Sequence, residues 1–343
     1  MASILHVINR MEIGGVEVGV LSLLKSGLSN YKILTVRGCD PEFLATLTPA
    51  ERDKVIVCNG IFSSVISAFK YNPDVVVTSL WRSHIVGLFL KLVKPGCKRI
   101  HFVHASGFAH YFDCFFSRIS LFFSNRVFCD SETTANLTKK YIDSNCNISI
   151  VPMNVSFGCN VIKKNKLDLK FIFIGRFNQI KNITDSIKFI NNLRNWGLTV
   201  SFDIFGRDDG DKIHLENLIK KLSLQEVVRI RGPIRPELVE NTMSEYSFYL
   251  QNSVKEGMSI SVFQSLRSGL IPVVTPVGEI PNYTEDSVNA FYISNDLELS
   301  SKRFHEMFVN GNFNDFSVGS ILNEKNYPSF HEAFKLALNE SYK

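Results

Sequence analysis

The sequence predicts an α/β protein with two Rossmann-like domains, each built on a parallel sheet, and three observations support this prediction. The chain has 343 residues, a length typical of two domains. Short apolar runs alternate with amphipathic stretches along it, as expected when parallel strands are connected by helices. The apolar runs are continuous, which is typical of strands covered on both faces.

The first series of strands and helices ends before residue 160. Amphipathic stretches at Gly15–Leu28 and Phe62–Tyr71 are its clearest helices. A polar, basic segment at 163–166 follows, so we place the domain boundary near 158–168. The predicted strands are Ile4–Ile8, Lys32–Val36, Lys54–Val57, Val75–Thr78, Arg99–Val103, Arg126–Cys129 and Ser149–Val151.

The same alternation starts again after the boundary. We expect an N-terminal domain over 1–160, a C-terminal domain over 168–325, and a C-terminal helix within 326–343, for which packing back onto the N-terminal domain is one alternative. The strands predicted in this second series are Lys170–Ile174, Thr199–Phe205, Val227–Arg231, Ser247–Leu250 and Pro272–Thr275. The predicted helices are Ile183–Trp196, Lys212–Leu222, Pro236–Met243, Ile260–Ser268 and, at the end of the chain, Ser329–Ser341.

Composition narrows the class of protein. A net charge of +5 and a pI of about 8.7 are too weakly basic to indicate nucleic-acid binding, although they suit phosphate ligands or an anionic membrane surface. The seven cysteines are scattered and contain no CxxC pair, which predicts reduced thiols in a cytoplasmic protein rather than disulfides or a zinc site. The N-terminus opens into a strand instead of a secretory signal, and the longest apolar stretch, Ile85–Val93, is too short to span a bilayer.

Ligands of Rossmann-like domains bind at the carboxyl ends of the strands, so we expect an active site in a cleft where the two domains face each other. The pair Gly14-Gly15 lies at such a point, between the first strand and the first helix. Glycines let the backbone approach a ligand closely, and a helix N-terminus favours an anion. A purely structural role for Gly14 and Gly15 is an equal alternative.

Two cations, Arg176 and Lys181, flank the loop after the strand Lys170–Ile174. Arg offers a planar fork of donors and Lys a compact point charge, and together they can neutralise a diphosphate. Cations held at that place would lower the barrier as a nucleoside diphosphate departs. The alternative is that both side chains are solvated loop charges.

A third group of residues begins at Glu256. It precedes the turn Gly257-Met258-Ser259, whose backbone N–H groups at the start of a helix would suit sugar hydroxyls or a phosphate. Ser259 is expected to cap that helix, and Gln264 lies within it. The alternative is a simple capping loop, with Gln264 as an ordinary polar helix residue.

These groups together resemble the family 4 glycosyltransferases, which are retaining enzymes with the GT-B fold. The order and spacing of the matching elements agree over residues 170–290. The resemblance implies that Arg176 and Lys181 hold the diphosphate and that Gln264 holds the ribose. It also implies that Glu256 and the Gly257–Ser259 backbone hold the donor sugar. The matching elements are Gly175-Arg176 with Lys181, Phe205-Gly206, Val228–Gly232, Ser253–Gly257, Gly269, Pro272–Val274 and Gly278.

The sequence departs from the family pattern at three places. Gln264 stands where the family has a second glutamate, and an amide loses the charge-assisted bond to a ribose hydroxyl. Met258-Ser259 replace the usual Phe-Gly, and Asn282 stands where a glutamate is common. These changes leave the identity of the donor undetermined. They also favour, as an alternative, a catalytically silent protein.

His104 follows the strand Arg99–Val103 and is expected at its carboxyl end, facing the cleft. In the family, a histidine at such a place contacts the donor sugar, which would make His104 part of the catalytic site with Arg176, Lys181 and Glu256. A lone histidine near a strand end otherwise has a structural role.

The segment Asp208-Asp209-Gly210-Asp211 has the composition of a metal site but is predicted to be a solvated loop. The resemblance implies that Arg176 and Lys181 neutralise the leaving group. We therefore expect no metal and no other cofactor besides the nucleoside diphosphate sugar, which is a co-substrate.

Eight of the 28 phenylalanines lie between Phe102 and Phe128. One interpretation of this stretch is a buried helix of the first domain. The other is an amphipathic element that docks on the inner membrane leaflet or grips a lipid-linked acceptor.

We therefore expect a metal-independent, retaining glycosyltransferase that moves a hexose-type sugar from a nucleoside diphosphate sugar to a glycan or lipid-linked oligosaccharide acceptor. By family analogy, such enzymes build bacterial surface polysaccharides in the cytoplasm, with peripheral contact to the inner face of the membrane. The alternatives are a silent binding subunit of a glycan-assembly complex and a sugar-nucleotide epimerase or phosphorylase of the same architecture.

Overall fold

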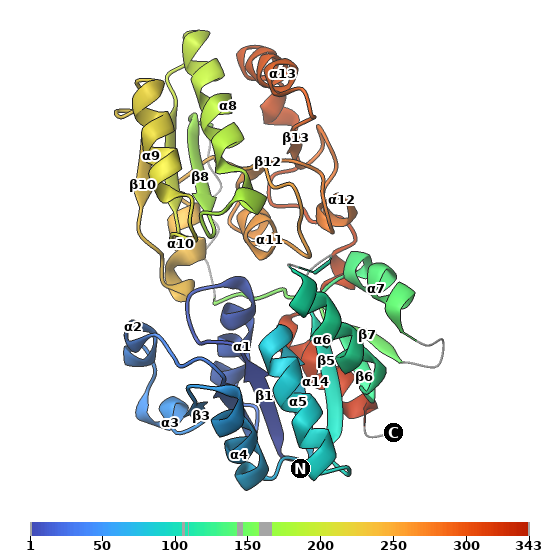
Figure 1. Ribbon diagram of the computed structural model, residues 1–343. Helices are drawn as coiled ribbons and strands as arrows, with labels where there is room; N and C mark the ends of the chain where they lie inside the picture. The colour runs from blue at the N-terminus through green and yellow to red at the C-terminus, as the bar shows by residue number, and fades with distance from the viewer. Residues whose placement is uncertain (1, 105–106, 109, 143–146, 158–166, 342–343) are drawn as a thin grey trace. The chain divides into compact units, whose positions relative to one another are not determined.

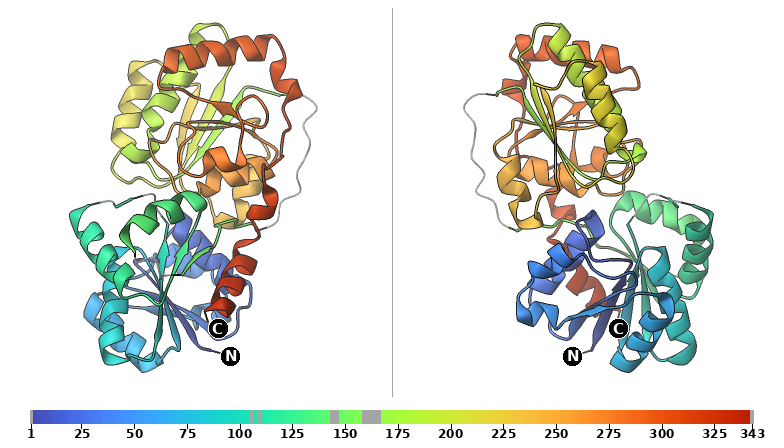
Figure 2. Two further views of the ribbon diagram at one scale, coloured as in Figure 1. Left: turned by 90° about the vertical axis from the view of Figure 1, so that its right-hand side faces the viewer. Right: turned by 60° about the vertical axis from the view of Figure 1, so that its left-hand side comes forward.

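The computed structural model describes residues 2–104, 107–108, 110–142, 147–157 and 167–341 (Figures 1 and 2). The chain divides into two compact units. Unit 1 comprises Met1–Val155 together with Pro328–Lys343, and unit 2 comprises Ser156–Tyr327. Much of the predicted boundary, together with Cys146 and Cys159, lies outside the described residues.

Unit 1 is built on a parallel sheet of seven strands in the order β3-β2-β1-β4-β5-β6-β7. The order reverses between β1 and β4, which is the switch point where ligands of such sheets bind. The parallel sheet of the sequence prediction is confirmed. The strands are β1 (Ile4–Ile8), β2 (Tyr31–Thr35), β3 (Val55–Val57), β4 (Val75–Ser79), β5 (Lys98–Val103), β6 (Arg126–Cys129) and β7 (Ile148–Ile150).

The helices of unit 1 begin and end where local chemistry favours it. Asn72 ends α4 in the left-handed conformation, which asparagine tolerates. The Ser131 side chain accepts a hydrogen bond from the backbone of Thr134 at the start of α7. The helices are α1 (Gly15–Lys25), α2 (Pro41–Ala45), α3 (Pro49–Arg52), α4 (Ile61–Tyr71), α5 (Trp81–Val93), α6 (Tyr111–Phe122), α7 (Glu132–Thr138) and α14 (Phe330–Glu340), with a 3-10 turn at Lys139–Tyr141.

The C-terminal helix α14 belongs to unit 1 and is the red helix beside the C mark in Figure 2. It packs against α1 and β7. Its Phe334 ring stacks on His6 of β1, and Arg126 of β6 forms an ion pair with Glu340 at 3.0 Å. Helix α14 is therefore held on the unit 1 sheet by both an apolar and a polar contact.

Unit 2 is built on a parallel sheet of six strands in the order β10-β9-β8-β11-β12-β13. The strands are β8 (Lys170–Ile174), β9 (Ser201–Phe205), β10 (Val228–Arg231), β11 (Phe248–Gln251), β12 (Ile271–Val274) and β13 (Phe291–Tyr292). The helices are α8 (Ile183–Asn195), α9 (Lys212–Lys221), α10 (Val239–Met243), α11 (Ile260–Arg267), α12 (Ile280–Tyr283) and α13 (Leu297–Val309), with 3-10 turns at Gln179–Lys181, Pro236–Leu238, Asn312–Asp315 and Glu324–Asn326.

Phenylalanine fills much of the core of unit 2. Phe304 of α13 lies against Phe171, Phe248 and Phe291, with ring centroids 5.2–5.7 Å apart. Offset and edge-on aromatic contacts at this spacing add to the apolar area that they bury. The high phenylalanine content is therefore explained partly by packing.

The phenylalanines of α6 are not core residues, so the interpretation of this stretch as a buried helix is wrong. Tyr111, Phe112, Phe115 and Phe122 are each at least 49% exposed. The buried positions of α6 are Ser117, Ser120 and Leu121. The helix packs through its serine face because Ser120 Oγ accepts a hydrogen bond from Arg99 at 2.8 Å and lies 2.9 Å from His101 Nδ1.

Across the described ranges, no helix is both long enough and apolar enough to cross a membrane.

Candidate functional site

The loops after β8 and β9 lie against each other at the carboxyl edge of the unit 2 sheet. Gly175 donates its backbone N–H to Phe205 O at 3.0 Å. Gly206 has φ +155, and a Cβ there would overlap the carbonyl oxygen of Gly175. A glycine at 206 thus allows the close approach that holds the Arg176 loop in place.

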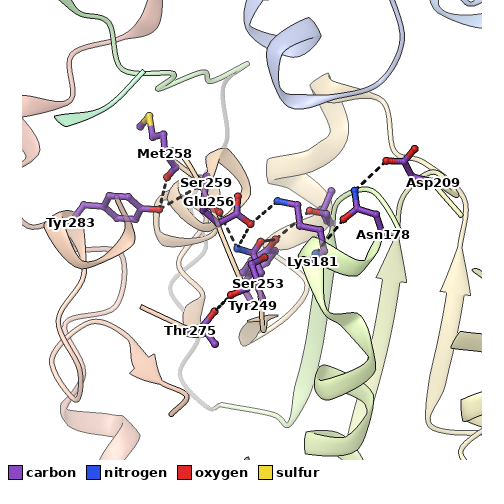
Figure 3. Close-up of polar contacts among 12 residues, drawn as sticks. Asn178, Lys181, Asp209, Tyr249, Ser253, Glu256, Met258, Ser259, Thr275 and Tyr283 are labelled. Atoms are coloured by element: carbon purple, nitrogen blue, oxygen red, sulfur yellow. Dashed lines mark hydrogen bonds and ion pairs between the residues drawn. The ribbon is translucent and has the colours of Figure 1, made fainter. Parts of the chain in front are cut away.

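Arg176 is held by an aspartate of the loop that follows β9. Its guanidinium lies 3.6 Å from Asp209 Oδ2. The same oxygen accepts a hydrogen bond from Asn178 Nδ2 at 3.1 Å (Figure 3). The Arg176 side chain is 52% exposed, so it keeps donors available to a ligand. Asn178 in turn accepts from Lys181 N at 3.2 Å, which caps the 3-10 turn that carries Lys181.

The structure brings Lys181 and Glu256 into direct contact. Lys181 Nζ donates to Glu256 Oε1 at 2.6 Å, and Figure 3 shows the two side chains pointing toward each other. The Lys181 side chain is 19% exposed and that of Glu256 is 8% exposed. The cation and the hydrogen bonds around it compensate a carboxylate that would otherwise be costly to bury.

Glu256 is also supported by a hydrogen bond from Gln251 of β11, which Tyr249 of the same strand supports in turn. Neither residue was predicted from the sequence. Gln251 Nε2 lies 3.2 Å from Glu256 Oε1 and 3.0 Å from Ser259 Oγ. Tyr249 OH donates to Gln251 Oε1 at 2.9 Å. Both residues are buried and stand two apart at the carboxyl end of a strand, so they share one face of the sheet. Two polar residues spaced two apart, on a strand that leads into a predicted site loop, are the sequence signal that could have identified them.

The turn after Glu256 has an unusual backbone. Ser259 has φ +56, in the left-handed region, and it precedes the first residue of α11. Its hydroxyl makes no capping hydrogen bond, so the prediction that the Ser259 side chain caps this helix is wrong. The hydroxyl oxygen instead accepts a hydrogen bond from Gln251 Nε2. Tyr283 OH donates to Met258 O at 2.8 Å, which holds the turn from the other side (Figure 3).

A second left-handed residue supports the same turn. Gly278 has φ +63, and a Cβ there would lie about 2.5 Å from Glu256 O. The next residue, Glu279, donates its backbone N–H to Gly257 O at 3.0 Å. The Glu256 loop is therefore clamped by the backbone of residues 278–279.

The other predicted residues of unit 2 lie farther along the chain. Gln264 lies in the second turn of α11 and is 6% exposed. Asn282 is exposed on α12. Met258 is buried, and Gly257 lies between Glu256 and Met258 in the clamped turn.

The aspartates at 208–211 serve the local backbone. Asp208 Oδ1 accepts from the backbone of Gly210, Asp211 and Lys212 at 2.9–3.1 Å, and these bonds hold the pKa of its carboxyl below the usual value. Asp209 pairs with Arg176. Within the described part of the chain, no group of three His, Cys, Asp or Glu side chains is arranged to hold a metal ion.

Unit 1 places the two glycines and the histidine of the sequence analysis at strand ends. Gly14 precedes α1 in an extended conformation, and a Cβ there would overlap the carboxylate of Glu17, a buried acid in the first turn of α1. The absence of a side chain at Gly14 thus leaves room for Glu17. Gly15 is the first residue of the helix and is exposed.

His104 follows β5 and is partly buried. Its Nε2 lies 2.8 Å from Ser79 Oγ. Burial, reinforced by the neighbouring His6 and His101, holds the pKa of His104 well below its usual value, so the ring is neutral at neutral pH. Its Nδ1 is buried and has no hydrogen-bond partner among the described residues.

Comparison with known proteins connects the site in unit 2 to a family. Residues 160–308 match the family described as glycosyl transferases group 1. This range lies within unit 2, and it contains Arg176, Lys181, Glu256 and Gln264. The group 1 match therefore covers the part of the chain that carries the motifs predicted to bind a nucleotide sugar.

Two curated relatives match over part of the chain. One is the gpi3 subunit of the phosphatidylinositol N-acetylglucosaminyltransferase of Schizosaccharomyces pombe, 27% identical over 49% of this chain and 37% of that protein. The other is the GtfA subunit of the UDP-N-acetylglucosamine–peptide N-acetylglucosaminyltransferase of Limosilactobacillus reuteri, 25% identical over 42% of this chain and 26% of that protein. The matched segments thus cover well under half of either relative.

Solved structures extend the likeness to the whole chain. HepE of Anabaena, in complex with UDP-glucose, aligns with a TM-score of 0.79 at 14% identity over 100% of both chains. Sucrose-phosphate synthase of Thermosynechococcus elongatus aligns with a TM-score of 0.79 at 13% identity over 100% of this chain and 98% of that one. With the two parallel sheets, these likenesses establish the GT-B fold that the sequence predicts.

Proposed function

We propose that this protein is a retaining, metal-independent glycosyltransferase that moves a hexose-type sugar from a nucleoside diphosphate sugar to a glycan or lipid-linked glycan acceptor in cell-surface polysaccharide biosynthesis. The observation that carries the proposal is the contact of Lys181 with Glu256 at the carboxyl edge of the unit 2 sheet, inside the segment that matches the group 1 glycosyl transferases. Retention of configuration rests on the resemblance to family 4.

Lys181 and Arg176 are assigned to the diphosphate. An ammonium group has three donors, and only one bond of Lys181 Nζ, to Glu256, is present among the described residues. The other donors suit phosphate oxygens. Donors held in place before the reaction stabilise the charge that develops as the nucleoside diphosphate leaves.

Glu256 is assigned to a hydroxyl of the donor sugar. Its Oε1 accepts from Lys181 and Gln251, whereas no described residue donates to its Oε2. A sugar hydroxyl that donates to Oε2 would form a charge-assisted hydrogen bond. Gln264 is assigned to the ribose, and His104 carries the proposed sugar contact of unit 1.

The experiment that tests this function begins with a panel of nucleoside diphosphate sugars in a thermal-shift assay, since saturating ligand raises the midpoint of unfolding. The donors that bind are then incubated with glycan and lipid-linked acceptors, and the anomeric configuration of the product is read by NMR. Transfer with retention is expected. Isomerised donor formed without acceptor would instead indicate an epimerase, and tight donor binding without turnover would indicate a silent subunit.

We further propose that unit 1 docks on an anionic lipid surface through α4, α5 and α6. The three helices are neighbours in the fold, with α5 packed against both others (Figure 1). Exposed cations, among them Lys70 and Arg118, accompany the apolar residues, and this combination suits anionic headgroups above an apolar layer. The exposed apolar residues are Phe62, Ile66 and Phe69 of α4, Phe89, Leu92 and Val93 of α5, and Tyr111, Phe112, Phe115 and Phe122 of α6, with Phe123 beyond it.

A further inference from the structure

One serine hydroxyl of unit 1 joins two histidines. Ser79 Oγ lies 2.8 Å from His6 Nε2 and 2.8 Å from His104 Nε2. His6 is on β1, Ser79 ends β4, and His104 follows β5, so the hydroxyl bridges three neighbouring strands at the switch point of the sheet. The arrangement links His104 to the interior of the unit.

The other nitrogen of His6 continues this link. His6 Nδ1 lies 2.8 Å from the hydroxyl of Tyr31 on β2. Tyr31, His6 and Ser79 are all buried. A chain of hydrogen bonds therefore runs from Tyr31 through His6 and Ser79 to His104, and it ends at His104 Nδ1.

The backbone beside Ser79 indicates that its position is held against strain. Leu80 has φ +72 and ψ 151, a conformation that a residue with a side chain rarely adopts. Such strain persists only where the surrounding structure enforces it, and it is concentrated at functional sites. Ser83 Oγ donates to Ser79 O at 2.7 Å and contributes to that restraint.

The number of hydrogens on these groups allows only two directions of donation along the hydrogen-bond chain. Burial lowers the pKa of His6 to about 3 and that of His104 well below its usual value, so each neutral ring carries one N–H. Ser79 has one O–H, so it donates to one histidine and accepts from the other. Tyr31 also has one O–H.

The buried end at Tyr31 decides between the two directions. If His104 donated to Ser79, His6 would donate to Tyr31, and the Tyr31 hydrogen would have no acceptor in the described part of the chain. A buried hydroxyl left without an acceptor costs about 1–3 kcal/mol. If Tyr31 donates to His6, every hydrogen bond among these four residues forms, and the N–H at His104 Nδ1 is the single group of the four residues left unpaired.

We infer that Tyr31, His6 and Ser79 hold His104 in the tautomer that carries its hydrogen on Nδ1, so that His104 offers an N–H donor to an acceptor oxygen of the nucleotide sugar. His104 then binds the ligand as a hydrogen-bond donor and does not serve as a general base through Nδ1. Tyr31, His6 and Ser79 are positioning residues, since they act through His104. The assignment of the acceptor to the nucleotide sugar rests on the proposed function, whereas the tautomer does not.

The tautomer is measured directly by two-bond ¹H–¹⁵N correlation NMR of the full chain labelled with ¹⁵N-histidine at neutral pH, without ligand. His104→Gln identifies the His104 signals. Wild-type protein is expected to show a protonated Nδ1 and an unprotonated Nε2 at His104. An unprotonated Nδ1 would overturn the inference, whatever the transfer activity.

Tyr31→Phe tests the cause of this preference. The change removes only the hydroxyl, after which either direction of the chain leaves the same number of groups unpaired. The His104 signals should therefore move to a mixture of both tautomers, and the KM for the donor should rise several-fold, with retained secondary structure. Tyr71→Phe is the matched control and should leave both unchanged, because the Tyr71 hydroxyl of the same unit donates to the Asn30 carbonyl at 3.4 Å and to no other residue that the structure describes.

An unchanged Nδ1–H tautomer in Tyr31→Phe would show that Tyr31 does not set it and would contradict the inference. If the tautomer behaves as expected but no donor and acceptor pair supports transfer, the proposed function fails while the inference about the tautomer stands. The two claims therefore fail separately.

Discussion

Lys181 Nζ lies 2.6 Å from Glu256 Oε1, so a cation and a carboxylate that come from separate sequence motifs form one ion pair. Lys181 follows β8 and Glu256 follows β11, and these strands are neighbours in the unit 2 sheet. Each side chain restrains the other before any ligand arrives. The first prediction tests that mutual dependence.

Replacing Lys181 by Ala should lower turnover on the order of a hundredfold or more, because a fixed cation at the departing diphosphate is lost. It should also destabilise unit 2 by roughly 1–3 kcal/mol, since a carboxylate only 8% exposed loses a hydrogen-bond donor. Steady-state kinetics and urea unfolding measure the two effects. Lys188→Ala, which breaks an exposed pair with Asp185 on α8, is the control and should change neither.

The double variant Lys181→Ala with Glu256→Gln separates the two roles. Removing the charge at 256 should recover much of the lost stability while turnover stays low. Recovered turnover, or wild-type turnover in Lys181→Ala, would contradict the assignment of Lys181 to the diphosphate.

Gln264 tests the departure from the family pattern. If Gln264 contacts the ribose, Gln264→Ala should weaken binding of the matching nucleoside diphosphate by about 1–2 kcal/mol, the scale of one or two lost hydrogen bonds. Gln264→Glu should keep or strengthen binding, because a carboxylate is the stronger acceptor. Calorimetric titration of the three proteins measures this. Equal affinities of the Ala variant and the wild type would mean that Gln264 does not touch the nucleotide.

Metal removal tests the role given to Arg176 and Lys181. Since these cations neutralise the leaving diphosphate in the proposed mechanism, transfer activity should persist in excess EDTA. The assay compares initial rates with and without the chelator. Loss of activity with EDTA that Mg²⁺ or Mn²⁺ restores would overturn the metal-independent mechanism.

The exposed helices of unit 1 predict binding to lipid vesicles. Wild-type protein should sediment with vesicles that contain phosphatidylglycerol and remain in solution with phosphatidylcholine alone, because both apolar burial and positive charge contribute. Phe62→Ser with Phe122→Ser should reduce the bound fraction several-fold. Ile213→Ser, which removes an exposed apolar side chain from α9 of unit 2, should not. Equal sedimentation of all three proteins would contradict the proposed surface.

Acid should destabilise unit 1 through its buried histidines. Burial lowers the pKa of His6 and of His101 from 6.5 to about 3 in the folded protein, so below pH 6.5 the unfolded chain binds more protons than the folded one. Their stabilising effect is complete above pH 6.5 and is lost progressively as the pH falls toward 3. Each contributes a slope of about 1.4 kcal/mol per pH unit in that window.

Urea unfolding at a series of pH values measures this slope. His101→Gln should reduce the slope between pH 6 and pH 4, after allowance for its own loss of stability. His214→Gln, at an exposed position on α9, should leave the slope unchanged. A slope independent of His101 would show that another group dominates the acid response.

Local pattern was sufficient for most secondary structure. The bounds predicted for β1, β6 and β8 agree with the structure, because a continuous run of β-branched and apolar residues between polar turns is a local signal. Helix α13 and the two-residue strand β13 were not predicted from the sequence. A strand of two residues carries too few positions to show a period.

By itself, the sequence determined the order of most strands and helices, the parallel sheets and the candidate residues Arg176, Lys181 and Glu256, because these depend on residues close together in the chain. Only the tertiary structure decided which candidates meet. Lys181 pairs with Glu256 because β8 and β11 are neighbours, and Ser79 reaches two histidines because β4 lies between β1 and β5.

The tertiary structure also decided which side of α6 is buried. Hydrophobicity favoured its phenylalanines, yet the serine face packs inward, since buried Arg99 and His101 find hydrogen-bond partners there. The physical reason is that a buried polar group must be paired, and its partner lies on a distant part of the chain that local periodicity cannot identify.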